Sequence, residues 1–266
     1  MNLIKRIISS IVLLAVSLFC LIQGEAYFFA LSTLIGAAIL YEIITFKQLK
    51  LGVLRRSTLV LALSCVFVSS LTATSAWTSP LTLIIAAFVI SLSGYELAKG
   101  KLLVKENRLF VALHTLLLIS FTVPFAIIIR NMPNGLVYLL YILIIISLTD
   151  SAAYFVGKRF GKHKLSPISP KKTIEGSLGG TLISTLAAFF FIRTTGLDIL
   201  PFLPLALSIS LISQLGDIHQ SLNKRSYNVK DASQLIPGHG GFYDRLDGYL
   251  FVFPYFVIVS TLLKLL

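Results

Sequence analysis

Long apolar runs alternate with short polar segments along almost the whole 266-residue chain. Most of these runs approach the ~20 residues that a helix needs to cross the hydrocarbon core of a bilayer. They lie at about 7–23, 25–46, 57–76, 79–98, 109–129, 135–150, 176–193, 197–216 and 248–266. The pattern predicts an all-α, polytopic integral membrane protein with about nine transmembrane helices.

Basic residues are distributed unevenly between the two sides that these spans define. Of the 23 Lys and Arg residues, all but Arg130, Arg193 and Lys264 fall on the side that carries the N-terminus. Because cytoplasmic loops of membrane proteins carry the excess of Lys and Arg, we expect the N-terminus to be cytoplasmic. The polar segments 151–175 and 217–247 then also face the cytoplasm, at the surface of the cell membrane.

We find no soluble domain appended to the alternating apolar runs and polar segments. We therefore interpret 1–266 as a single membrane domain, with N-terminal helical spans at 1–146, a catalytic portion at 147–250 and a last span at 248–266. The net charge of +12 lies between apolar runs, which favours anionic membrane lipids as partners and not nucleic acid. Cys20 and Cys65 lie in separate apolar runs and indicate neither a disulfide nor a metal site.

The longest polar interval, 217–247, combines carboxylates, cations and glycines. Asp217 follows an apolar run directly, so we expect it at a helix end, and Asp244 and Asp247 lead into the next run. Carboxylates at a membrane edge are usually functional, and hard oxygens suit Mg²⁺. A solvated loop of mixed charge is the alternative. The cations of the segment are Lys224, Arg225, Lys230 and Arg245, and its glycine-rich stretch is His239, Gly240 and Gly241.

The second polar segment contains two prolines immediately before paired cations. Pro167 and Pro170 restrict their own backbone and that of the preceding residue. Lys171 and Lys172 are therefore expected on a stiff turn, where phosphate binding costs less entropy. A plain basic loop explains the other cations of this segment equally well.

Two Tyr-Glu pairs, Tyr41-Glu42 and Tyr95-Glu96, each close a predicted span at its cytoplasmic end. Interfacial anchoring by the tyrosines is the favoured interpretation. The alternative is that one of the glutamates supports the polar site.

Both polar segments resemble the phosphatidate cytidylyltransferases (CDP-diacylglycerol synthases) in the order and spacing of many residues. The matching positions are Asp150, Ala153-Tyr154, Gly157, Phe160-Gly161, Pro167 to Thr173, Glu175-Gly176, Ser221, Lys224-Arg225, Lys230-Asp231, Ser233, Ile236-Pro237, His239 to Gly241, Asp244-Arg245 and Asp247. The chain departs from the pattern at Ile174, Gln220 and Asn223. The resemblance covers about 150–250.

The resemblance implies an enzyme that converts CTP and phosphatidate into CDP-diacylglycerol and pyrophosphate, in phospholipid biosynthesis. Phosphatidate arrives largely ionised, because the second pKa of a phosphate monoester is about 6, so the reaction needs charge neutralisation more than a base. Mg²⁺ is the expected cofactor, with Asp217, Asp244 and Ser221 as candidate ligands and Asp247 and Asp150 in support. The candidate catalytic residues are Asp217, Asp244, Asp247, Lys171 and Lys172, and those for substrate binding are Ser221, Lys224, Arg225, Lys230, His239, Gly240, Gly241 and Arg245. The family also suggests a homodimer.

Two alternatives stay open. A CTP-dependent lipid kinase of the polyprenol or phytol type would share CTP and a membrane substrate. A transporter for a phosphorylated metabolite or divalent cation would instead carry polar residues deep within several spans, whereas the acidic residues here gather at the cytoplasmic ends.

Overall fold

The computed structural model describes residues 3–45, 84–87, 90–91, 95, 108–167, 169–226, 228–236 and 240–265. Within these ranges the chain is helical, and the only β-pairing is two isolated bridges, Lys164 with Thr173 and Ile236 with Gly240. The bounded helices are α1 (Leu3–Gln23), α2 (Glu25–Ile44), α5 (Arg108–Asn131), α6 (Gly135–Phe160), α7 (Ile174–Thr195), α8 (Ile199–Ser226) and α9 (Tyr249–Leu262).

These helices confirm an all-α membrane protein. Four stretches are long and apolar enough to cross a bilayer, namely Ala26–Ile43, Gly135–Phe160, Ile174–Thr195 and Ile199–Arg225. Shorter apolar helices cover Ile11–Gln23, Leu118–Asn131 and Tyr249–Leu262. The predicted span at 57–76 lies outside the described residues, and so does most of the span predicted at 79–98.

Two helices are longer than their apolar runs suggest. Helix α6 continues to Phe160 and α8 continues to Ser226, each about ten residues beyond the predicted span. The expectation that Asp217 marks a helix end is therefore wrong, because Asp217 lies inside α8. The added turns contain strong helix formers such as Lys and Arg near the helix C-terminus, where cations are favourable.

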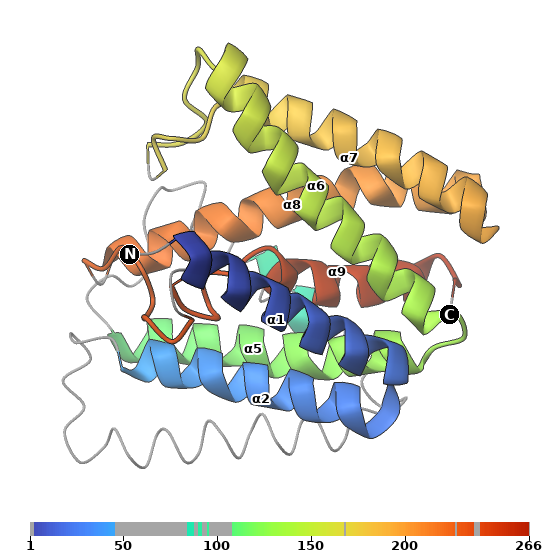
Figure 1. Ribbon diagram of the computed structural model, residues 1–266, viewed down its shortest axis with the longest axis horizontal. Helices are drawn as coiled ribbons and strands as arrows, with labels where there is room; N and C mark the ends of the chain where they lie inside the picture. The colour runs from blue at the N-terminus through green and yellow to red at the C-terminus, as the bar shows by residue number, and fades with distance from the viewer. Residues whose placement is uncertain are drawn as a thin grey trace.

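Successive described helices run in alternating directions, so the connections gather at two ends of the bundle (Figure 1). One end carries the N-terminus and the connections at 161–173 and 227–248. The opposite end carries the turns at Gly24, 132–134 and 196–198, together with the C-terminus. Arg130 ties two of these turns together, since its guanidinium donates to the carbonyls of Leu21 (2.7 Å) and Ile22 (3.1 Å).

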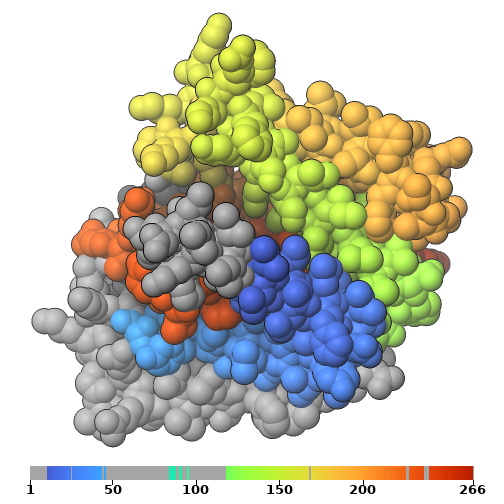
Figure 2. All heavy atoms as spheres, viewed as in Figure 1, coloured from blue at the N-terminus to red at the C-terminus, as the bar shows by residue number. Residues whose placement is uncertain are grey.

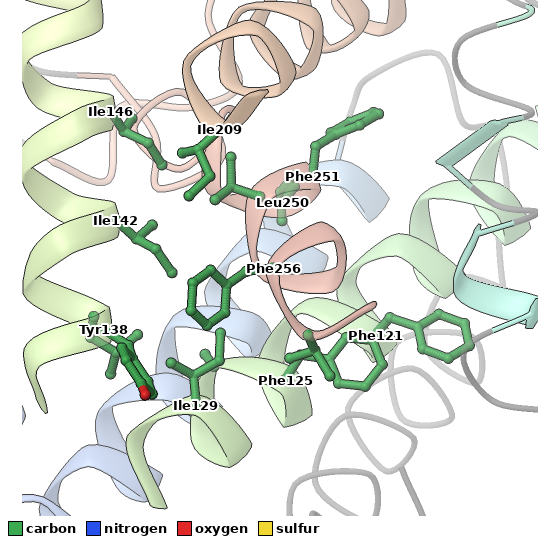
Figure 3. Packing of buried hydrophobic residues seen from close by; sticks show 14 of the residues in the cluster. Phe121, Phe125, Ile129, Tyr138, Ile142, Ile146, Ile209, Leu250, Phe251 and Phe256 are labelled. Carbon is green, nitrogen blue, oxygen red and sulfur yellow. The ribbon is translucent and has the colours of Figure 1, made fainter. Parts of the chain in front are cut away.

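The core of the bundle lies where α5, α6, α8 and α9 meet. Tyr138, Ile142 and Ile146 of α6 point toward Ile209 of α8 and Phe256 of α9 (Figure 3). The Tyr138 ring stacks with the Phe202 ring at 5.7 Å. Dense packing of this kind fixes the position of α9 relative to α8. The polar connection between these two helices belongs to the candidate site.

Helices α6 and α7 approach closely because glycines line their contact. A Cβ atom on Gly180 would lie 2.7 Å from the carbonyl oxygen of Thr149, and one on Gly176 would lie 2.7 Å from that of Ala153. Small residues at a contact allow the backbones of two membrane helices to approach closely. The opposite face of α7 exposes large apolar side chains such as Leu178 and Leu182, as expected for contact with lipid.

Candidate active site

The connection between α6 and α7 is a closed, hydrogen-bonded loop. Lys172 N–H donates to the Ser169 carbonyl (3.0 Å), with Pro170 between them in the position that a β-turn favours. The Glu175 carboxylate accepts from Lys162 N–H (3.0 Å) and contacts His163 Nδ1 (2.6 Å). The stiff turn predicted from the prolines is thus present, and Lys172 follows it.

Lys172 reaches across to α8, where its ammonium forms an ion pair with the Asp217 carboxylate. Both side chains remain about a quarter exposed, at 26% and 27%. The pair joins two segments that are far apart in sequence and that surface at the same end of the molecule (Figure 2). Neither side chain of the pair is therefore fully buried within the protein.

Asp217 belongs to a group of three carboxylates with Asp150 of α6 and Asp247, which precedes α9. Burial raises the pKa of Asp247 well above its ordinary value, and the charges of Asp217 and Asp150 raise it further. Lys172 and the Gly248 N–H, which donates to Asp247 Oδ1 at 2.8 Å, act in the opposite direction. The raised pKa means that the Asp247 carboxyl favours its neutral form beside the other two acids, and a cation bound at this place would stabilise its ionised form.

Asp244 has a different environment from these three carboxylates. Its carboxylate accepts from Lys224 Nζ (2.6 Å), Ala232 N–H (2.8 Å) and Gly241 N–H (3.0 Å). Only 13% of the Lys224 side chain and 10% of the Asp244 side chain are exposed. Asp244 therefore joins α8 to two parts of the polar connection that follows it.

Glu42, at the C-terminal end of α2, meets the same connection from the other side. Its carboxylate is fully buried and accepts from Ser233 Oγ (2.7 Å), Phe242 N–H (2.9 Å) and Tyr243 N–H (2.8 Å). A residue from the N-terminal third of the chain thus holds the glycine-rich part of the site. The alternative in which a glutamate supports the polar site is favoured at this position, whereas Glu96 lies outside the described residues.

Helix α8 anchors the turn that carries Asp244 and Asp247. Gln220 Nε2 donates to the Tyr243 carbonyl, and Asn223 Nδ2 donates to the Tyr243 hydroxyl at 2.9 Å. Gly216 leaves no room for a side chain, because a Cβ atom there would lie 2.8 Å from the Asp247 carbonyl oxygen. Gln220 and Asn223, which depart from the family pattern, are buried contacts of this turn.

A network of uncharged polar side chains lies in the helices beneath the carboxylates. Ser210 Oγ accepts from Thr149 Oγ1 (2.9 Å) and donates to Thr181 Oγ1 (3.1 Å), which also accepts from Gln214 Nε2 (3.0 Å). These bonds connect α6, α7 and α8 one to two turns from Asp217. Sequence reasoning missed this network because isolated hydroxyls in apolar runs do not show which helices they face.

The remaining predicted site residues that are described lie at the same end of the bundle as these carboxylates. Ser221 is on α8 one turn after Asp217, and Gly240 and Gly241 are in the held turn. Gly240 has a φ of 84°, and a Cβ atom there would lie 2.9 Å from Asp244 Oδ2. Four cations are exposed, namely Lys171, Arg225, Lys230 and Arg245, and His239 lies outside the described residues.

The carboxylates of the site suit Mg²⁺ only if a bound substrate supplies some of the oxygen atoms that coordinate the metal. In the part of the chain that is described, no three His, Cys, Asp or Glu side chains form a group that could hold a metal ion by themselves. Mg²⁺, however, is commonly held by one or two carboxylates together with waters and substrate phosphates. Asp217, accessible and next to Asp247 and Asp150, fits that mode better than Asp244, whose oxygens already accept three hydrogen bonds.

Comparison with known proteins gives a consistent result over the whole chain. The model of a family described as "Cytidylyltransferase family" matches residues 4–263. The chain is 36% identical over 266 residues to a phosphatidate cytidylyltransferase of Bacillus subtilis, covering 97% of both chains. It is 32% identical over 255 residues to one from Staphylococcus saprophyticus, covering 94% of this chain and 95% of the relative. A Staphylococcus aureus relative of the same name is 47% identical over 125 residues, 46% of this chain and 48% of its own.

Proposed function

The chain belongs to the cytidylyltransferase family, and we propose that it transfers the cytidylyl group of CTP to phosphatidate, giving CDP-diacylglycerol and pyrophosphate. The observation that carries this proposal is the Lys172–Asp217 pair beside Asp150 and Asp247. A cation that can bind phosphate and carboxylates that can bind a metal meet there at one end of a membrane bundle. That combination suits a reaction between two polyanions at a membrane surface.

The reaction needs no strong base from the protein. An oxygen of the ionised lipid phosphate attacks the α-phosphorus of CTP, and the bond from that phosphorus to the oxygen bridging to the β-phosphorus breaks. The bridging oxygen keeps the electron pair and leaves with pyrophosphate. The residues must therefore hold both polyanions in line and balance their charge.

Three cations have positions that support such a role. Lys172, which stands on its turn at the carboxylate group, is suited to exchange part of its contact with Asp217 for a phosphate oxygen. Lys171 is exposed on the same turn. Lys224 is held by Asp244, so it contributes a fixed positive charge.

Mg²⁺ is part of the proposal, with Asp217 as its principal protein ligand and Asp247, Asp150 and Ser221 as supporting groups. When bound it would neutralise the charge that develops on the leaving pyrophosphate. Asp244 was the second ligand expected from the sequence. Its bonds to Lys224, Ala232 and Gly241 instead favour a role in positioning.

We further propose about nine spans, a cytoplasmic N-terminus and a site that faces the cytoplasm at the cell membrane. The distribution of basic residues supports this orientation. The alternating helices support it too, since the N-terminus and both polar connections lie at one end of the bundle. A homodimer, suggested by the family resemblance, belongs to the proposal and is tested by the mass of the detergent-solubilised protein.

The position of label transferred from CTP tests the chemistry. Purified protein with phosphatidate and Mg²⁺ should yield labelled lipid from α-labelled CTP, and should release the γ-label as pyrophosphate. A lipid kinase would instead transfer γ-label to a neutral lipid such as a polyprenol, and a transporter would release no pyrophosphate. Either of those outcomes would overturn the proposed function.

A further inference from the structure

Three successive backbone N–H groups in the polar connection each donate to a carboxylate. Gly241 N–H donates to Asp244, and the next two, of Phe242 and Tyr243, donate to Glu42. The distances are 3.0, 2.9 and 2.8 Å. One acid belongs to the turn itself, and the other comes from a helix about 200 residues earlier in the chain.

Glu42 fits this turn closely. A Cβ atom on Gly241 would lie 2.5 Å from Glu42 Oε2, so the carboxylate occupies the space that a side chain would need. Ser233 Oγ donates to Glu42 Oε1 (2.7 Å) and accepts from Leu235 N–H (3.1 Å). Glu42 therefore connects two parts of the 227–248 connection to α2.

A carboxylate is costly to bury, and interfacial anchoring of a span does not require one. The penalty is offset only where several donors meet the charge, and here two backbone amides and a hydroxyl do so. Amides in a turn away from regular secondary structure need an acceptor when buried. The carboxylate therefore stabilises one particular backbone conformation of residues 241–243.

We propose that Glu42 is a positioning residue of the active site. It holds the turn so that the Asp244 carboxylate points at Lys224 and at Gly241 N–H, and so that Asp247 follows beside Asp217. Helix α2 is then a functional part of the site as well as a membrane anchor. The inference rests on the proposed function for its consequence in catalysis, but its structural content stands apart from the reaction.

Two substitutions separate positioning from packing. Glu42→Gln conserves shape but places an NH₂ group against backbone donors, whereas Glu42→Asp conserves the charge and loses a methylene. We expect Glu42→Gln to lower kcat roughly 100-fold, the scale of a small misplacement of catalytic groups, and Glu42→Asp to lower it less. A packing role predicts the reverse order. Tyr41→Ala, a change at the exposed neighbour, is the control and should retain activity.

Hydrogen exchange gives a measurement that does not depend on activity. In full-length protein in detergent or nanodiscs, the amides of Phe242 and Tyr243 should exchange roughly ten-fold faster in Glu42→Gln, equivalent to about one lost hydrogen bond. Amides of α6 should not change. Unchanged exchange at residues 242–243, or a Glu42→Gln enzyme as active as wild type, would overturn the inference. If wild-type protein makes no CDP-diacylglycerol but the exchange result holds, the proposed function fails and the positioning contact remains.

Discussion

Replacing Asp244 with Asn tests whether this carboxylate holds the site together. The Asn carbonyl can still accept from Ala232 and Gly241 N–H, which lie 2.8 and 3.0 Å from Asp244 Oδ2. The side that faced Lys224 becomes an NH₂ group, which opposes an ammonium 2.6 Å away. The substitution therefore removes one interaction selectively and leaves Lys224 without its carboxylate.

The size of the effect follows from burial. With side chains only 13% and 10% exposed, this pair lies closer to the buried than to the surface case. Removing one partner of a buried pair destabilises a protein by about 3–5 kcal/mol. At about 2–4 °C per kcal/mol for a chain of a few hundred residues, we expect the melting temperature to fall by roughly 6–20 °C. Activity at a permissive temperature should fall as well.

Thermal unfolding of the detergent-solubilised protein, followed by size-exclusion chromatography, measures this change. Asp231→Asn is the matched control, because it removes an exposed carboxylate from the same connection. Adding Lys224→Met to Asp244→Asn removes the unpaired ammonium and should restore part of the stability but not the activity. A single Asp244→Asn variant that melts within about 2 °C of wild type would refute the argument.

Further predictions concern Asp217, α7 and the topology. Asp217→Asn breaks a pair whose side chains are partly exposed, so the free energy of unfolding should fall by less than about 1 kcal/mol. Turnover should fall by orders of magnitude, and near-normal turnover would contradict the proposed role of Asp217. Gly180→Ala should lower the melting temperature, since its Cβ would press on a backbone carbonyl of α6; Leu182→Ala, on the exposed face of the same helix, should not. Single-cysteine probes in a cysteine-free background should label Lys164 only with access to the cytoplasmic face and Pro133 only from outside; labelling of position 164 in intact cells would reverse the orientation.

Much of the site could be predicted because its residues lie in two compact polar intervals. The paired charges within 217–247 and the proline-stiffened turn before Lys172 are local features, and local features are visible in sequence. Which carboxylate pairs with which cation could not be predicted in this way. Lys172 pairs with Asp217, 45 positions away, and Lys224 pairs with Asp244, 20 positions away. The first pairing depends on how the connection between α6 and α7 packs against α8, and the second depends on how the connection between α8 and α9 folds back onto α8.

The all-α class and the membrane character could be predicted from the sequence, because the length of an apolar run reflects the solvent that surrounds it. The spacing shared with a family also predicted which polar segments form the candidate site. The position of Asp217 inside α8 results from packing, since Gln220 and Asn223 in the extension of that helix bond to the turn that lies against it. The contact of Glu42 with the amides of Phe242 and Tyr243 is likewise a product of folding. A carboxylate buried 200 residues from its donors has no local pattern, because its stability comes entirely from contacts made on folding.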